Sequence, residues 1–197
     1  MTFTSQLISE LNKEIIKLPD GFYDTFKYTT TGRNYTHPIT LSILSKILSQ
    51  MKNVQYVAID FRLKEGDAKF RPDLVALSKL EPFQPVLFID YESPNSSDMR
   101  IPTKNIDAYI AWSKIFQQQI PYIIITTLPD KKPNSWELRY TSEGYPNAAF
   151  TRKKKDIFMN PFQFWYSEYK KSLKSKNLND IFFINIDGKI AKQISLL

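Results

Sequence analysis

The sequence predicts one α/β domain over residues 1–197, with a mixed central β-sheet flanked by helices. Two apolar runs, 84–91 (QPVLFIDY) and 121–128 (PYIIITTL), are typical of strands that are buried on both faces of a sheet. A helical period over 99–118 separates these runs, as in a strand–helix–strand unit. Alternating residues around the turn Lys64-Glu65-Gly66-Asp67 indicate a β-hairpin before them.

The chain begins with a predicted amphipathic helix over residues 4–17. Leu7 and Leu11 lie on its apolar face, and Thr4 or Ser5 is the expected cap. We expect an irregular connection after this helix, because the following residues are rich in turn formers.

A second helix is predicted from Pro38 to about Met51, because proline suits the first turn of a helix. The hairpin arms are expected over 54–63 and 69–78. In the helix over 99–118, Asp98 is the expected cap, and the inward side chains are Ile106, Tyr109, Ile110 and Phe116.

After the second buried strand, the sequence predicts a short strand over 136–141, a helix over 160–175 and a last strand over 180–186. We take about 38–130 as the core of the domain and 131–197 as its basic C-terminal part. No composition shift marks a boundary between two domains.

The composition excludes several classes of site. The chain has no cysteine, so it forms no disulfide, thiolate zinc site or iron–sulfur cluster. Its single histidine, His37, excludes metal sites with several histidines. No apolar run approaches the ~20 residues of a membrane span, and the N-terminus is too polar for a signal peptide. We therefore expect a cytoplasmic protein without a membrane partner.

The net charge of +7 is concentrated in one segment. Residues 131–176 hold 11 Lys/Arg and 4 Asp/Glu, whereas the rest of the chain holds 16 of each sign. Aromatic residues are interspersed with these charges, which favours a polyanion partner such as nucleic acid. The alternative is a lysine-rich, solvated face. The predicted nucleic-acid-binding residues are Arg152, Lys153, Lys154, Lys155, Lys170, Lys171 and Lys174.

Three acids lie beside or within apolar strands, where a carboxylate without a compensating partner is unfavourable. Asp73 precedes an apolar strand, Asp90 ends another, and Glu92 follows two residues later on the same strand face. Two carboxylates on one buried face repel each other and cost several kcal/mol of desolvation. Mg²⁺ removes both problems and prefers such oxygen ligands, and Mn²⁺ is an expected substitute. Asp73 from the neighbouring strand would complete the metal site.

Lys104 lies in the first turns of the next predicted helix, twelve residues after Glu92. In a tight strand–loop–helix unit, these turns pack near the carboxyl end of the strand. A lysine there can orient an attacking water or stabilise the charge on a phosphorane. The alternative is an exposed lysine that pairs with Asp107.

Pro72-Asp73 followed by Asp90-x-Glu92 resembles the motif of the PD-(D/E)XK nuclease superfamily. The motif of that family lies on a hairpin and the central strand that follows it, and its third position is normally Lys rather than Glu92. A few type II restriction enzymes have a carboxylate there. In another branch, an acid-x-x-Ser-Pro stretch precedes a lysine on the next helix; Asp90 to Pro94, with Lys104 and Tyr109 beyond, looks similar to it.

The resemblance covers about residues 54–130 and implies a restriction-endonuclease-like fold and metal-dependent DNA cleavage. In this interpretation Asp73 and Asp90 bind Mg²⁺, Glu92 is a ligand or general base, and Lys104 acts on the transition state. A homodimer would allow both DNA strands to be cut, in restriction, repair or a mobile element. The alternatives are an RNA endonuclease of the superfamily and an inactive nuclease-fold module for nucleic-acid binding or assembly.

Three further residues have weaker indications of a role. Glu14 is a candidate extra metal ligand, as an N-terminal-helix acid is in some superfamily members; the alternative is a solvated residue. Asp60, on the hairpin partner, is placed to face Asp73. His37 is expected to be a surface or capping residue, although an RNA-cleaving branch of the superfamily uses an N-terminal histidine in its metal site.

Overall fold

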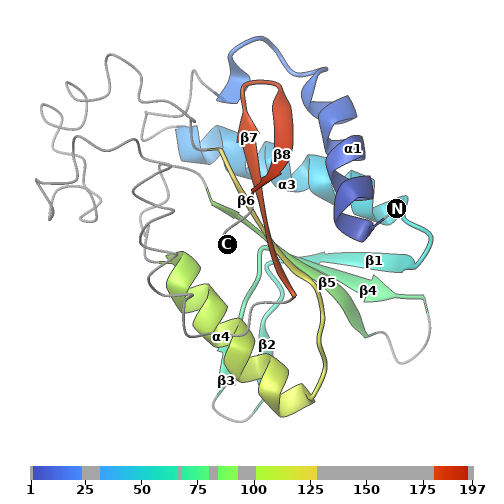
Figure 1. The fold of residues 1–197 in the computed structure, drawn as a ribbon, viewed down its shortest axis with the longest axis vertical. Coiled ribbons are helices and arrows are strands. Elements are labelled where there is room, and N and C mark those ends of the chain that lie inside the picture. The colour runs from blue at the N-terminus through green and yellow to red at the C-terminus, as the bar shows by residue number, and fades with distance from the viewer. Residues whose placement is uncertain are drawn as a thin grey trace, which may run out of the picture.

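A computed structural model of the chain describes residues 2–23, 32–65, 68–79, 84–92, 101–127 and 180–194. Figure 1 shows helices around a twisted sheet. The helices are α1 (Phe3–Ile15), α3 (Gly32–Ser49) and α4 (Ile101–Phe116). The strands are β1 (Val54–Ile59), β2 (Leu63–Glu65), β3 (Ala68–Phe70), β4 (Leu74–Ser78), β5 (Pro85–Glu92), β6 (Tyr122–Thr126), β7 (Ile181–Asp187) and β8 (Ile190–Ile194).

The main sheet has six strands in the order β1-β4-β5-β6-β7-β8. Antiparallel pairs join β1, β4 and β5, parallel pairs join β5, β6 and β7, and the β7–β8 pair is antiparallel. The predicted mixed α/β sheet is therefore confirmed, and β5 lies in its interior between β4 and β6. The parallel β5–β6 pair requires the crossover that α4 provides.

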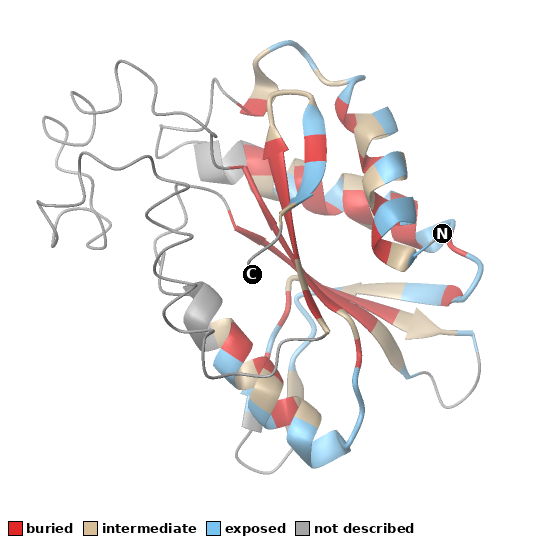
Figure 2. Cartoon of the chain, in the orientation of Figure 1, coloured by how far each residue is buried: buried red, intermediate tan, exposed pale blue. Residues whose placement is uncertain are grey.

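The two faces of the sheet bury separate apolar cores. The core on one face includes Leu11 of α1 and Leu44 of α3, and the core on the other includes Trp112 of α4. Side chains of β5 alternate between them, so Ile89 lies in the first core and Phe88 in the second. Figure 2 shows buried residues along the centre of the sheet. Burial of each such apolar side chain stabilises the fold by about 1.5–3 kcal/mol. A buried carboxylate among them instead requires hydrogen bonds or a charged partner.

The N-terminal ends of α1 and α3 differ from the prediction. Thr2, rather than Thr4 or Ser5, caps α1, since its side chain accepts a hydrogen bond from the Ser5 N–H. Helix α3 begins at Gly32, so Pro38 lies inside the helix rather than at its start. A proline inside a helix removes one N–H donor, and its ring crowds the carbonyl of the preceding turn, so Pro38 costs the helix stability at this point.

The predicted hairpin is confirmed, but both of its arms are interrupted. The inner parts, β1 and β4, pair in the main sheet, and β2 and β3 form a separate two-stranded sheet. On one arm Asp60 adopts a left-handed φ of 55° after β1. On the other arm Pro72 has no N–H to continue a ladder of hydrogen bonds. These two interruptions lie side by side, because the Asp60 N–H donates to the Asp73 carbonyl at 2.8 Å.

The remaining helices and strands agree in part with the prediction. Ile106 and Tyr109 of α4 are buried as predicted, whereas Phe116 is 40% exposed and stacks on Trp112. Strand β7 matches the predicted last strand, and β8 was not predicted. The predicted cap Asp98, the strand over 136–141 and the helix over 160–175 lie outside the described residues. None of the described helices is long and apolar enough to cross a membrane.

Candidate active site

Asp73 lies at the point where the chain enters β4, on the side of the sheet that faces α3. Its Oδ2 accepts a hydrogen bond from the Tyr91 backbone N–H at 2.8 Å and lies 3.3 Å from Nε2 of His37. The Asp73 side chain is 27% exposed. Its second oxygen, Oδ1, has no hydrogen-bond partner within the described part of the chain. Asp73 therefore offers one carboxylate oxygen to a ligand.

Asp90 lies on the adjacent strand, β5, and is only 1% exposed. Its Oδ1 accepts the Asp73 backbone N–H at 2.7 Å, and its Oδ2 accepts Nδ2 of Asn105 at 2.9 Å and the hydroxyl of Tyr122. Asp90 thus binds the N–H of Asp73 itself, and Asp73 binds the N–H of Tyr91, the residue after Asp90. This reciprocal pair holds the two carboxylates close together, as expected for acids on neighbouring strands.

The surroundings of Asp90 raise its pKa to about 7. Burial is the largest cause, because a low dielectric disfavours the charged form, and the negative charge of Asp73 adds to it. The hydrogen bonds from Tyr122, the Asp73 N–H and Asn105 oppose this shift, since they stabilise the carboxylate. Asp90 is therefore poised to gain or lose a proton near neutral pH.

Glu92 and Lys104 are the other two predicted catalytic residues. Glu92 ends β5 and is buried, at 9% exposed, on the same strand face as Asp90. Lys104 lies in the first turn of α4. The next residue, Asn105, binds Asp90, so this part of α4 packs near the carboxyl end of β5 as predicted.

A cavity of about 660 Å³ opens beside Asp73. Helix α3 provides one wall, and the two interrupted hairpin arms provide the other. The lining residues are His37, Pro38, Leu41, Ser42, Ser45, Ile59, Asp60, Arg71 and Asp73. The cavity thus brings a guanidinium and an imidazole next to two carboxylates.

Asp60 and Arg71 form an ion pair at this cavity, through Oδ2 and Nη2. Both side chains are about half exposed, at 57% and 51%. Asp60 is predicted to face Asp73, and the structure brings its backbone there, but its carboxylate binds Arg71 instead. His37, expected at the surface, lies in the cavity against Asp73.

Two partners of Asp90 were missed from the sequence. In the first four residues of β6, only Tyr122 carries a side-chain hydroxyl, and the other three are isoleucines. That hydroxyl in an otherwise apolar run was the one sequence feature that could have pointed to this contact. Asn105 directly follows Lys104, but its type and spacing alone gave no indication of its contact with Asp90. Both contacts depend on the crossover that places β6 and α4 beside β5.

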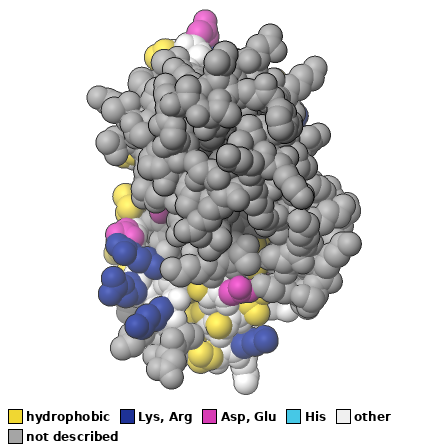
Figure 3. All heavy atoms as spheres, turned by 90° about the vertical axis from the view of Figure 1, so that its left-hand side faces the viewer, with side chains coloured by type: hydrophobic (Ala, Val, Ile, Leu, Met, Phe, Trp, Pro, Cys, Tyr) yellow, Lys and Arg dark blue, Asp and Glu magenta, His cyan; other side chains and the backbone are white. Residues whose placement is uncertain are grey.

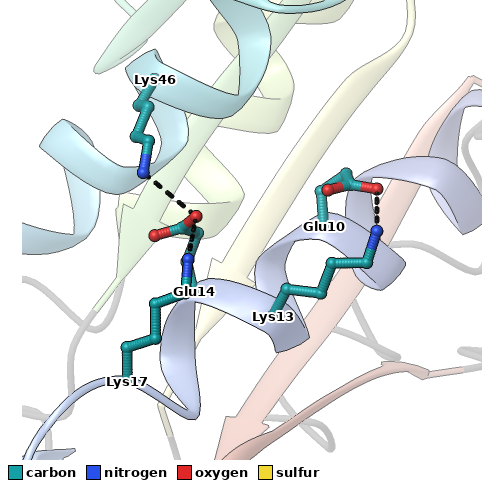
Figure 4. Close-up of polar contacts among 5 residues, drawn as sticks. All are labelled: Glu10, Lys13, Glu14, Lys17 and Lys46. Atoms are coloured by element: carbon teal, nitrogen blue, oxygen red, sulfur yellow. Dashed lines mark hydrogen bonds and ion pairs between the residues drawn. The ribbon is translucent and has the colours of Figure 1, made fainter.

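Glu14 is not among the described residues that line the cavity. Its carboxylate instead binds Lys17 at 2.8 Å and Lys46 of α3 at 3.1 Å, as Figure 4 shows. These contacts lower the pKa of Glu14, with the hydrogen bond from Lys17 as the largest cause. Through these contacts Glu14 joins α1 to α3.

The predicted nucleic-acid-binding residues, at 152–155, 170, 171 and 174, lie outside the described residues. Figure 3 shows several Lys and Arg side chains at the end of the molecule where α4, β2 and β3 lie. Within the described ranges, no group of three or more His, Asp or Glu side chains is gathered to hold a metal ion.

Comparison with known proteins adds no relative. No protein-family model matches the chain, no curated protein matches it, and no solved structure matches it. The assignment of a function therefore rests on the residues and geometry described above.

Proposed function

We propose that this protein is a Mg²⁺-dependent endonuclease with a restriction-endonuclease-like fold that hydrolyses phosphodiester bonds in DNA. The observation that carries the proposal is the reciprocal pairing of Asp73 and Asp90 on adjacent strands, beside a cavity of about 660 Å³. The order of hairpin, central strand, helix and parallel strand agrees with the resemblance of the sequence to the PD-(D/E)XK superfamily.

The donor set fits a hard divalent cation such as Mg²⁺ or Mn²⁺. Asp73 offers Oδ1 toward a ligand, and Oδ1 of Asp90 accepts only one hydrogen bond in the described part, from the Asp73 N–H. The charge of Asp73 raises the pKa of Asp90, which indicates a mutual repulsion that a cation would relieve. A bound Mg²⁺ supplies an activated water and neutralises charge on the scissile phosphate.

The residues of the chain take distinct roles in this proposal. Asp73 and Asp90 hold the metal, with Glu92 as a further ligand or general base. Tyr122 and Asn105 orient the Asp90 carboxylate, and Lys104 stabilises the charge that develops on the phosphate. The basic segment over 131–176 contacts the DNA backbone, and a homodimer in the cytoplasm cuts both strands.

The test is incubation of the purified protein with supercoiled plasmid DNA and, separately, with single-stranded RNA, in Mg²⁺, Mn²⁺ or EDTA. We expect plasmid cleavage with either metal and none in EDTA. An Asp73→Asn variant purified in the same way controls for contaminating nucleases. Absence of cleavage in every metal contradicts the proposal, and preferential cleavage of RNA assigns the chain to RNA instead, which the contact of His37 with Asp73 would then explain.

A second candidate function is an inactive nuclease-fold module that binds nucleic acid. The observation that favours it is the burial of Asp90, whose Oδ2 is bound by two protein donors. Metal-independent DNA binding without cleavage is the expected result for this candidate, so the same experiment separates the two.

A further inference from the structure

Arg71 combines three properties of a phosphate-binding residue. It lies in the cavity with Asp73, and half of its side chain is exposed to solvent. Its guanidinium has five N–H donors, of which Nη2 binds Asp60. The fork of a guanidinium matches the oxygens of a phosphodiester, with which it forms paired hydrogen bonds. None of the roles assigned above to Asp73, Asp90, Glu92 and Lys104 uses this cation.

The Asp60 carboxylate binds the Arg71 guanidinium, at the position where a bound phosphate would be expected. The backbone of Asp60 is fixed, because its φ is left-handed and its N–H donates to the Asp73 carbonyl at 2.8 Å. Its carboxylate binds Arg71 at the solvent-exposed side of the cavity. Exposed ion pairs of this kind are weak, since water and salt screen them. A polyanion can therefore displace the Asp60 carboxylate without a large cost.

Other donors line the same cavity. His37 and the hydroxyls of Ser42 and Ser45 come from α3, opposite Arg71. The Ser45 hydroxyl oxygen is buried and has no hydrogen-bond partner among the residues described. A buried hydroxyl without a partner is unfavourable, which makes Ser45 a candidate donor to a ligand in the cavity that it lines.

We propose that Arg71 binds a backbone phosphodiester of the DNA substrate in this cavity, and that Asp60 occupies the guanidinium until DNA displaces it. The inference rests on the proposed function for the identity of the substrate. It places one phosphate next to Asp73 and assigns Asp60 as an internal competitor of the substrate.

The test measures binding without catalysis. A fluorescein-labelled single-stranded DNA of about 12 nucleotides is titrated with protein in EDTA at low salt, where phosphate contacts contribute most. We expect Arg71→Gln to weaken binding about tenfold, the size of a lost hydrogen bond to a charged group, and Arg71→Lys to recover part of it. Asp60→Asn is expected to tighten binding about threefold, because the competing carboxylate is removed.

Helix α1 offers controls of the same charge change. Glu10 and Lys13 form an exposed ion pair away from the cavity, which Figure 4 shows. Glu10→Gln changes the net charge as Asp60→Asn does, and Lys13→Gln changes it as Arg71→Gln does. We expect both controls to alter binding by less than about twofold, because neither side chain lines the cavity and a single distant charge interacts weakly through water. Equal effects in the variants and in their controls overturn the inference.

The remaining outcomes separate this inference from the proposed function. DNA cleavage by the wild type, with Arg71→Gln binding no weaker than its control, overturns the inference alone. Arg71-dependent DNA binding without cleavage in any metal supports the inference and overturns the nuclease proposal. Displacement of the labelled DNA by inorganic phosphate, at the same concentration of phosphate groups as unlabelled DNA, assigns the site to a free anion and overturns the DNA assignment. If Arg71→Gln does not fold, the Asp60→Asn result decides.

Discussion

Asp90 accepts the Asp73 N–H and Asp73 accepts the Tyr91 N–H, yet the surroundings of the two carboxylates differ. Asp73 is 27% exposed and faces α3, His37 and the cavity, whereas Asp90 is 1% exposed and faces α4 and β6. Burial raises the pKa of Asp90 to about 7. The difference teaches that two acids of one motif can have different roles. Asp73 is open to a ligand, whereas protein donors hold Asp90 in place and the charge of Asp73 raises its pKa.

The largest expected effect is on cleavage. Replacement of Asp73 or Asp90 by Asn removes a charged metal ligand but keeps the shape of the side chain. Either variant should lose about 10³-fold or more in plasmid cleavage rate, since the metal contributes several kcal/mol to the transition state. Glu10→Gln on α1 is the control and should cleave normally. Persistent cleavage by either active-site variant would remove that residue from the metal site.

The stability of the two variants should differ with pH. A raised pKa means that folded Asp90 keeps its proton up to about pH 7, whereas the unfolded chain loses it near pH 4. The wild type is therefore most stable below about pH 4 with respect to this group, and it loses up to about 4 kcal/mol as the pH rises through 7. Asp90→Asn should remove this loss, and Asp73→Asn should move it to lower pH.

Urea denaturation in EDTA at about pH 5 and pH 8 measures the difference. Other titrating groups contribute alike to all three proteins, so the comparison is between wild type and variant. A wild-type pH dependence unchanged in Asp90→Asn would show that the carboxylate is not held in the buried environment described here.

The next effect concerns the first turn of α4. Lys104→Ala should lower the turnover of bound DNA by about 10²-fold, because a group that acts on the developing charge changes the rate. The affinity for DNA in EDTA should change by less than about threefold. Single-turnover cleavage and DNA titrations provide the two numbers, and equal losses in both would make Lys104 an ordinary phosphate contact.

The smallest effect tests the donors around Asp90. Tyr122→Phe removes the hydroxyl that binds Oδ2, which should destabilise the fold by about 1–3 kcal/mol at pH 8 and by less at pH 5. Tyr109→Phe is a matched control, because the Tyr109 hydroxyl donates to the neutral Ile120 carbonyl at 2.6 Å. Its cost should not depend on pH. A pH-independent cost for Tyr122→Phe would contradict the charge assigned to Asp90 at pH 8.

The sequence was sufficient to predict most of the sheet. Continuous apolar runs and the Lys64–Asp67 turn predicted β5, β6 and the hairpin, because local pattern and burial agree there. The predicted start of α3 was wrong, because the helix continues on the N-terminal side of Pro38 despite the cost of a proline inside it. The prediction also missed that the arms separate at Asp60 and Pro72.

In the site, only the contacts that follow from local sequence patterns could be predicted. Strand alternation and the hairpin were enough to bring Asp73 next to Asp90. The contacts of Tyr122 with Asp90 and of Arg71 with Asp60 depend on the crossover and on a backbone turn, which no periodicity in the sequence encodes. The role of Lys153 and its basic neighbours remains a prediction, since they lie outside the described residues.

Metal binding tests the central claim without reliance on a substrate. Mn²⁺ bound to protein loses the sharp paramagnetic resonance signal of the free ion, so titrations of wild type, Asp73→Asn and Glu10→Gln can be compared directly at about pH 8, where Asp90 is ionised. We predict that the wild type and Glu10→Gln bind Mn²⁺ and that Asp73→Asn does not. Equal binding by all three proteins would contradict the assignment of Asp73 and Asp90 as the metal site.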